Sequence, residues 1–174
     1  MRARIALSVG CPCGVGPEVS VAAAAAERGA QVLLVGDGRT IEEAAKGRGI
    51  DAGRVVRVSE PGGAWALPRG RVAVWQPTND LRQRDRRPGA PTAASGAAQL
   101  AWVDAACDVV VRGDADALVT GPVSKGVIAS LNASRAARQF LGHTEHLQRR
   151  LHAREVTMAF ANEKLTTALV TTHL

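Results

Sequence analysis

Aromatic residues are rare in this chain of 174 residues: tyrosine is absent, and aromatic side chains make up 3% of the sequence. A domain that binds single-stranded nucleic acid usually stacks bases on aromatic side chains along a basic groove. The net charge of +6 favours anionic partners, but the arginines are scattered, and the one dense run is Arg82-Gln-Arg-Asp-Arg-Arg87. The composition therefore argues against a nucleic-acid-binding protein.

Cysteine is also scarce, and long apolar runs are missing. Cys11, Cys13 and Cys107 cannot all pair in disulfides, and one C-x-C pair without a second pair is a weak metal signal. No apolar run approaches the ~18 residues of a membrane span. The N-terminus lacks a signal-peptide pattern, because its short apolar segment ends at once in glycine and cysteine. These absences indicate a cytoplasmic protein that does not bind membranes.

Hydrophobic residues (46%) and charged residues (22%) are present in the proportions of a soluble globular protein. The length is close to that of a single domain. Apolar segments predict strands at residues 4–9, 31–35, 54–58, 71–75, 117–120, 156–161 and 167–172. Helical spacing predicts helices at residues 19–28, 40–46, 95–112 and 145–151, with a loop at 76–91. Alternating strands and helices indicate an α/β fold with a parallel sheet covered on both faces.

Two predicted strands end in polar residues, at Thr120-Gly-Pro-Val-Ser-Lys125 and at Thr171-Thr-His173. Ligands of open parallel sheets bind beyond the carboxyl ends of the strands. Lys125 is therefore a candidate phosphate contact, although an exposed lysine is more often only solvated. His173, which we expect to follow a buried strand, is a candidate metal ligand. The glycine-rich turn at 10–16 does not fit the dinucleotide fingerprint, so its spacing assigns no nucleotide there.

A third polar cluster is Gly142-His-Thr-Glu-His146. Gly142 permits a sharp turn, and Thr144 is predicted to cap a helix that begins at Glu145. His143 would then lie at the helix N-terminus, which attracts anions. An ordinary capped surface helix explains the same spacing. On spacing alone, His143 and His146 also look like a pair of metal ligands.

Four segments taken together resemble the 4-hydroxythreonine-4-phosphate dehydrogenase family of the vitamin B6 pathway. They are IALSVGCPCGVGPE at 5–18, DALVTGPVSK at 116–125, GHTE at 142–145 and ALVTTHL at 168–174. The opening GVGPE is also similar to the isocitrate and isopropylmalate dehydrogenase superfamily. The resemblance implies a mostly parallel three-layer sandwich, with a first α/β domain at about 1–130 and the start of a second domain at about 131–174.

The resemblance also implies a reaction, namely NAD-dependent oxidation of 4-phosphooxy-L-threonine to a 3-oxo acid. That acid loses carbon dioxide to give 3-amino-2-oxopropyl phosphate. It implies a divalent metal (zinc, magnesium or cobalt), a small phosphorylated substrate and a homodimer. By the family motifs, His143 and Thr144 contact the substrate and His173 binds the metal, whereas His146 does not. Lys125 is kept as a substrate-phosphate contact; catalytic and cofactor-binding residues are not assigned.

Two departures from the family pattern define the alternatives. Cys11 stands where family members usually have aspartate, so a polar role at that turn is lost or changed. The family chain is nearly twice as long, and the remaining metal histidines and most of the cofactor site belong to its other half. The chain is thus expected to be either a family dehydrogenase or a truncated or split relative that is inactive alone and acts in binding or assembly. A related four-carbon phosphorylated acid, such as threonate or erythronate phosphate, stays open as the substrate.

Overall fold

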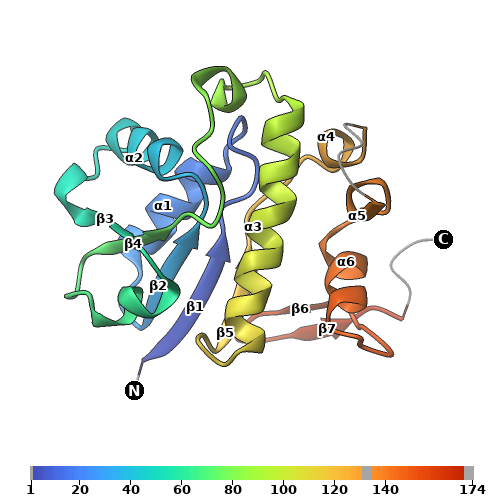
Figure 1. The fold of residues 1–174 in the computed structure, drawn as a ribbon. Coiled ribbons are helices and arrows are strands. Elements are labelled where there is room, and N and C mark those ends of the chain that lie inside the picture. Colours follow the sequence, from blue (N-terminus) through green and yellow to red (C-terminus); the bar gives the residue numbers. More distant parts are fainter. Residues whose placement is uncertain (1, 131–134, 171–174) are drawn as a thin grey trace. The chain divides into compact units, whose positions relative to one another are not determined.

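The computed structural model describes residues 2–130 and 135–170 (Figure 1). The chain divides into two compact units, Met1–Phe140 and Leu141–Leu174. We describe each unit by itself. His173 lies outside the described residues. The predicted domain boundary near residue 130 remains a prediction.

The first unit contains a parallel sheet with strand order β3-β4-β2-β1-β5. The strands are β1 (Ala3–Ser8), β2 (Ala30–Val35), β3 (Val55–Val58), β4 (Val72–Trp75) and β5 (Ala117–Thr120). The α-helices are α1 (Gly16–Ala26), α2 (Gly38–Gly47), α3 (Ala93–Val111), α4 (Lys125–Ser130) and α5 (Arg135–Arg138). Three 3-10 helices complete it: η1 (Ala52–Arg54), η2 (Pro61–Ala66) and η3 (Gln83–Arg86). The predicted order of strands and helices is therefore confirmed here.

Both faces of this sheet are covered by helices. Successive side chains of each strand point to opposite faces, so neighbouring strand residues pack in different apolar clusters. On β2, Leu33 belongs to one apolar cluster together with Trp102 of α3. The next residue, Leu34, belongs to a second cluster with Val21 of α1 and Ile41 of α2. Helix α3 runs along one face, and α1 and α2 lie together at the other (Figure 1). The predicted three-layer α/β fold is confirmed.

Helices α2 and α3 begin two residues earlier than predicted, because their capping residues lie earlier in the chain. Helix α1 begins at Gly16 with Pro17 in its first turn, a position that favours proline. The helix predicted at residues 40–46 begins at Gly38, because its cap is Asp37, whose Oδ1 accepts hydrogen bonds from the backbone N (2.8 Å) and the hydroxyl (2.7 Å) of Thr40. Helix α3 begins after Thr92, which forms a capping box with Ser95.

The second unit contains α6 (His143–Arg150) and two short strands, β6 (Ala159–Ala161) and β7 (Thr166–Ala168). These strands pair antiparallel in a separate two-stranded sheet, and all their residues are exposed. The predicted buried strand at 167–172 is thus wrong over its described part. The tight turn, in which Asn162 Oδ1 accepts backbone hydrogen bonds from Lys164 (2.8 Å) and Leu165 (2.9 Å), pairs β7 with β6 in an antiparallel hairpin instead of adding it to the parallel sheet. Parallel strands would need a longer crossover.

Among the described helices, none is long and apolar enough to cross a lipid bilayer.

Asp37 provides a test of this packing. Its carboxylate is fully buried and, besides capping α2, accepts a hydrogen bond from the backbone N of Leu81 (3.1 Å). Asp37→Ala leaves these buried donors without an acceptor, so it should lower the free energy of unfolding by about 2–4 kcal/mol. The control is Asp51→Ala, which removes an exposed cap of η1 and should cost about 1 kcal/mol or less. Urea unfolding of both variants gives the comparison, and equal losses would contradict the assignment.

Candidate functional site

Two of the sequence motifs meet at the carboxyl edge of the parallel sheet. The turn after β1 and the loop after β5 are joined by backbone hydrogen bonds from Cys11 N to Pro122 O (2.8 Å) and from Gly121 N to Ser8 O (2.7 Å). Gly10 has a φ of 85°, a conformation that favours glycine. Such an edge is where open parallel sheets bind ligands.

Positions 10 and 121 require glycine, because the backbone of the turn after β1 lies very close to that of the loop after β5. A Cβ on Gly10 would collide with the carbonyl oxygen of Pro122, and one on Gly121 would collide with the carbonyl oxygen of Val9. Gly10 and Gly121 therefore allow the two main-chain segments to lie against each other. This explains a glycine-rich turn that does not match a nucleotide fingerprint.

The loop that leads to Lys125 is held by a buried glutamine. Gln99 of α3 is fully buried; its Oε1 accepts a hydrogen bond from Ser124 N (2.8 Å), and its Nε2 donates to Ser95 O (3.1 Å). Lys125 begins α4 and is exposed. Sequence reasoning missed Gln99; the only available signal was one polar residue on the apolar side of a long helix.

Cys11 and Cys13 are free, buried thiols in the same turn. Cys13 Sγ donates to the backbone carbonyl of Asp85 (3.3 Å), and Cys13 O accepts from Gly89 N (2.8 Å). Burial raises the pKa of the Cys13 thiol, while a hydrogen bond with Ser95 opposes that shift. A buried thiol with a raised pKa is a poor nucleophile, so Cys13 has a structural role in this arrangement.

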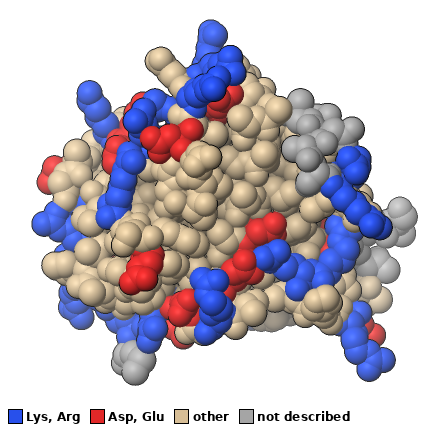
Figure 2. Space-filling model, in the orientation of Figure 1, with Lys and Arg blue, Asp and Glu red and all other residues tan. Residues whose placement is uncertain are grey.

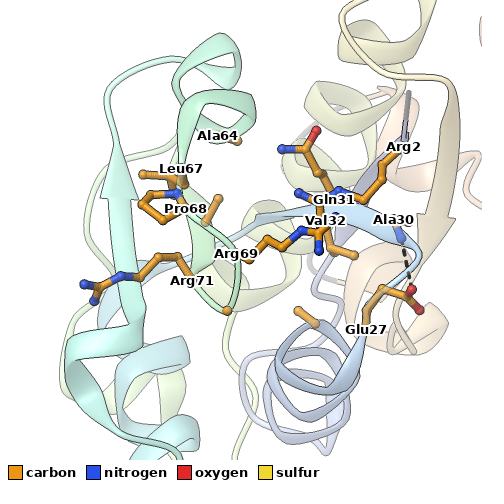
Figure 3. Close-up of a pocket in the computed structure, with 13 residues that line it drawn as sticks. Arg2, Glu27, Ala30, Gln31, Val32, Ala64, Leu67, Pro68, Arg69 and Arg71 are labelled. Atoms are coloured by element: carbon orange, nitrogen blue, oxygen red, sulfur yellow. Dashed lines mark hydrogen bonds between the residues drawn. The ribbon is translucent and has the colours of Figure 1, made fainter.

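A pocket of about 40 Å³ lies at the opposite, amino edge of the sheet (Figure 3). Glu27 at its border accepts hydrogen bonds from the backbone N of Ala30 (3.0 Å), Gly29 and Arg28. These bonds lower the pKa of its carboxyl. The side chain thereby closes the end of α1. The small volume and the position at the strand beginnings give this pocket a structural role.

In the second unit, α6 begins at His143 after the N-cap Gly142, and no side chain caps it. Thr144 is the second helical residue, so the prediction that it caps the helix is wrong. His143 and Thr144 are half-buried in the first turn, whereas His146 is buried. His143 and His146 lie on the same face of α6, because they are three residues apart, and the Nε2 atom of His143 is buried as well.

Within residues 2–130 and 135–170, no group of three His, Cys, Asp or Glu side chains could hold a metal ion. The residue that the family motifs assign to the metal, His173, lies outside the described residues. Lys125 belongs to the first unit, whereas His143 and Thr144 belong to the second. The expected roles of these three residues, and of His173, remain predictions.

The comparisons with known proteins identify the family. The family model described as pyridoxal phosphate biosynthetic protein PdxA matches residues 28–174. The chain belongs to this family. The expectation from the four sequence motifs is confirmed.

Relatives named 4-hydroxythreonine-4-phosphate dehydrogenase match nearly the whole chain. The relative from Geobacter metallireducens is 35% identical over 179 residues, which cover 99% of this chain and 49% of the relative. The relative from Acidithiobacillus ferrooxidans is 37% identical over 175 residues, which cover 98% and 49%. The chain thus spans about half the length of the curated relatives it matches. Their names support the expectation of an oxidoreductase at the level of the family.

Solved structures agree with the fold. A 4-hydroxythreonine-4-phosphate dehydrogenase from Burkholderia phymatum has a TM-score of 0.82 and 24% identity, and the match covers 100% of this chain and 51% of that one. A terephthalate 1,2-cis-dihydrodiol dehydrogenase from Burkholderia xenovorans has a TM-score of 0.60 and 27% identity, with coverages of 78% and 39%. The shared architecture is therefore that of about half of the first structure and a smaller part of the second.

Gly10 and Gly89 allow a matched test of the backbone contact, because both have a positive φ (85° and 72°) but only Gly10 has neighbours where a Cβ would go. Gly89→Ala should cost about 1–2 kcal/mol of unfolding free energy from its backbone conformation alone. Gly10→Ala should cost about 1–3 kcal/mol more, because the turn and the loop after β5 must move apart. Chemical denaturation measures both; a similar cost for the two variants would contradict the contact.

Proposed function

We propose that this chain supplies the N-terminal half of an NAD- and divalent-metal-dependent dehydrogenase that acts on 4-phosphooxy-L-threonine. The reaction removes a hydride and a hydroxyl proton from the secondary alcohol. The resulting 3-oxo acid releases carbon dioxide and leaves 3-amino-2-oxopropyl phosphate. The observation that carries the proposal is membership of the family, together with the family motifs that meet at the carboxyl edge of the sheet.

The proposed work of this chain is to bind and orient the substrate. His143 and Thr144 offer an imidazole and a hydroxyl in the first turn of an eight-residue helix, where N–H groups and the helix dipole favour an anion. Lys125 offers an exposed positive charge after a loop that Gln99 holds in place. NAD is the proposed hydride acceptor, and His173 is the residue proposed for the metal. One imidazole alone is too few, since catalytic metal sites usually have about three protein ligands.

A binding or assembly half without activity of its own is the second candidate. It is favoured by the missing group of metal ligands among the described residues and by the match to about half of each relative. In this case the motif residues would hold a phosphorylated acid, while the chemistry would need residues from another chain. The two candidates share the substrate contacts and differ in turnover.

Activity separates these candidates. The 174-residue chain alone should produce no NADH from 4-phosphooxy-L-threonine with zinc, magnesium or cobalt, because it offers too few metal ligands. Mixing it with the C-terminal half of a curated relative should restore turnover if the chain is a dehydrogenase half. NADH absorbance is the measurement, with threonate and erythronate phosphates as alternative substrates. Turnover by the chain alone that depends on His173 would overturn the expectation, and failure of complementation with a folded partner half would favour the assembly half.

Substrate binding should survive without turnover. Lys125→Gln and Thr144→Val should each weaken binding of 4-phosphooxy-L-threonine by about tenfold, since each removes one polar contact to a charged group. The matched controls are Lys46→Gln and Thr166→Val, which change exposed residues of α2 and β7. Titration calorimetry gives the affinities. Equal weakening by the controls would remove these residues from the substrate site.

We also propose that the chain associates with itself through the second unit. Phe160 is 63% exposed and Leu165 is 64% exposed, and both belong to the β6–β7 hairpin region. Exposed apolar surface of this kind favours association. A variant with Phe160→Ser and Leu165→Ser should sediment as a smaller species than the parent chain, whereas Val15→Ser with Val111→Ser, at exposed sites of the first unit, should not. A parent chain that is already monomeric at micromolar concentration would refute this proposal.

A further inference from the structure

The arginine run is a fixed part of the carboxyl edge. It forms η3 and the residue on either side of it, and Cys13 holds it through its bonds to Asp85 O and Gly89 N. The Asp85 carboxylate is buried and accepts a hydrogen bond from the Thr92 hydroxyl (2.7 Å), which ties the run to the start of α3. The run is therefore a preorganised element rather than a solvated loop.

A cavity of about 480 Å³ opens beside this run, and we call it the η3 pocket. Its lining residues are Glu43, Gln83, Arg84, Arg86, Arg87 and Pro88. Figure 2 shows basic side chains gathered at the top of the view, where the loop that carries η3 lies in Figure 1. The volume is within the range of small-molecule sites. No aromatic side chain lines the pocket, so it lacks a platform for stacking bases.

The charges in this pocket are only partly compensated. Arg86 is 11% exposed and forms an ion pair with Glu43, while its buried Nε has no hydrogen-bond partner among the described residues. Arg84 is 73% exposed and lies 3.8 Å from Asp85, a long contact to a carboxylate that Thr92 already engages. Arg87 is exposed and forms no ion pair with any described residue. Three arginines against Glu43 and the neighbouring Asp85 leave a net charge of one positive at the pocket.

A second cavity of about 870 Å³ shares Arg84 with the η3 pocket. Its far wall is the alanine-rich side of α3, formed by Ala93, Ala94, Ala97, Ala98 and Ala101. It therefore provides room, next to the arginines, for an uncharged body attached to an anionic group.

We propose that the η3 pocket binds a diphosphate group, either as free pyrophosphate or as part of a nucleoside diphosphate. Guanidinium groups match phosphate oxygens in pairs, so Arg84 and Arg87 can each hold one phosphoryl group beside the buried charge of Arg86. The residues proposed to contact the dehydrogenase substrate are not among those that line this pocket. The inference therefore stands apart from the proposed function.

The test is titration calorimetry of the 174-residue chain with pyrophosphate, ADP and inorganic phosphate at physiological ionic strength. Pyrophosphate should bind saturably and at least about tenfold more tightly than phosphate, because two guanidinium groups engage it. The double variant Arg84→Gln with Arg87→Gln should lose about tenfold or more in affinity. ADP that binds more tightly than pyrophosphate identifies a nucleoside diphosphate, and equal affinity identifies the free diphosphate.

The matched control is Arg48→Gln with Arg138→Gln, which removes the same charge at exposed sites near the ends of α2 and α5. This control should bind as the parent chain does. Arg84→Lys with Arg87→Lys keeps the charge and should still lose affinity if the paired geometry matters; circular dichroism checks that each variant is folded.

Three results would overturn the inference. The first is no saturable binding of pyrophosphate or ADP, and the second is an equal loss in the control, which would show attraction by net charge alone. The third is a single-stranded oligonucleotide that binds more tightly than either diphosphate through Arg84 and Arg87.

Discussion

The backbone contact between the turn after β1 and the loop after β5 is the constraint on which the first unit depends. Two main chains lie against each other only because Gly10 and Gly121 have no side chains. The contact sets where Cys11, Cys13 and the start of the loop toward Lys125 lie, and the bond from Cys11 N to Pro122 O completes it. A substitution at either glycine would therefore displace the turn after β1 and the loop after β5 together.

Buried polar side chains extend that constraint outward. Asp37 joins the end of β2 to α2 and to Leu81, and Asp85 joins η3 to the start of α3. Each carboxylate satisfies backbone or hydroxyl donors that would otherwise be buried without partners. The segment between β4 and α3 has little apolar content, so these bonds, rather than a hydrophobic core of its own, keep it in place.

The sequence predicts the first unit well, because its strands and helices repeat with clear periodicity and each buried strand residue has an apolar partner layer. The helix caps Asp37 and Thr92 were not predicted, because the apolar periodicity of a helix does not show which residue before it acts as the cap. The two strands of the hairpin were predicted, but their exposure was not, because a short apolar run looks the same in a buried strand and in an exposed one. Gln99 was missed because its partners, Ser124 and Ser95, are known only once α3 is placed beside the loop.

The two units differ in how completely they cover their own apolar surface. The first has a core on each face of its sheet, although β5 is an edge strand and Val119 on it is 43% exposed. Parallel strands are normally covered on both faces. The second unit has one buried residue in α6 and a two-stranded sheet that is exposed throughout, and an isolated hairpin is marginally stable in water. The hairpin therefore depends more than the parallel sheet does on contacts outside its own strands.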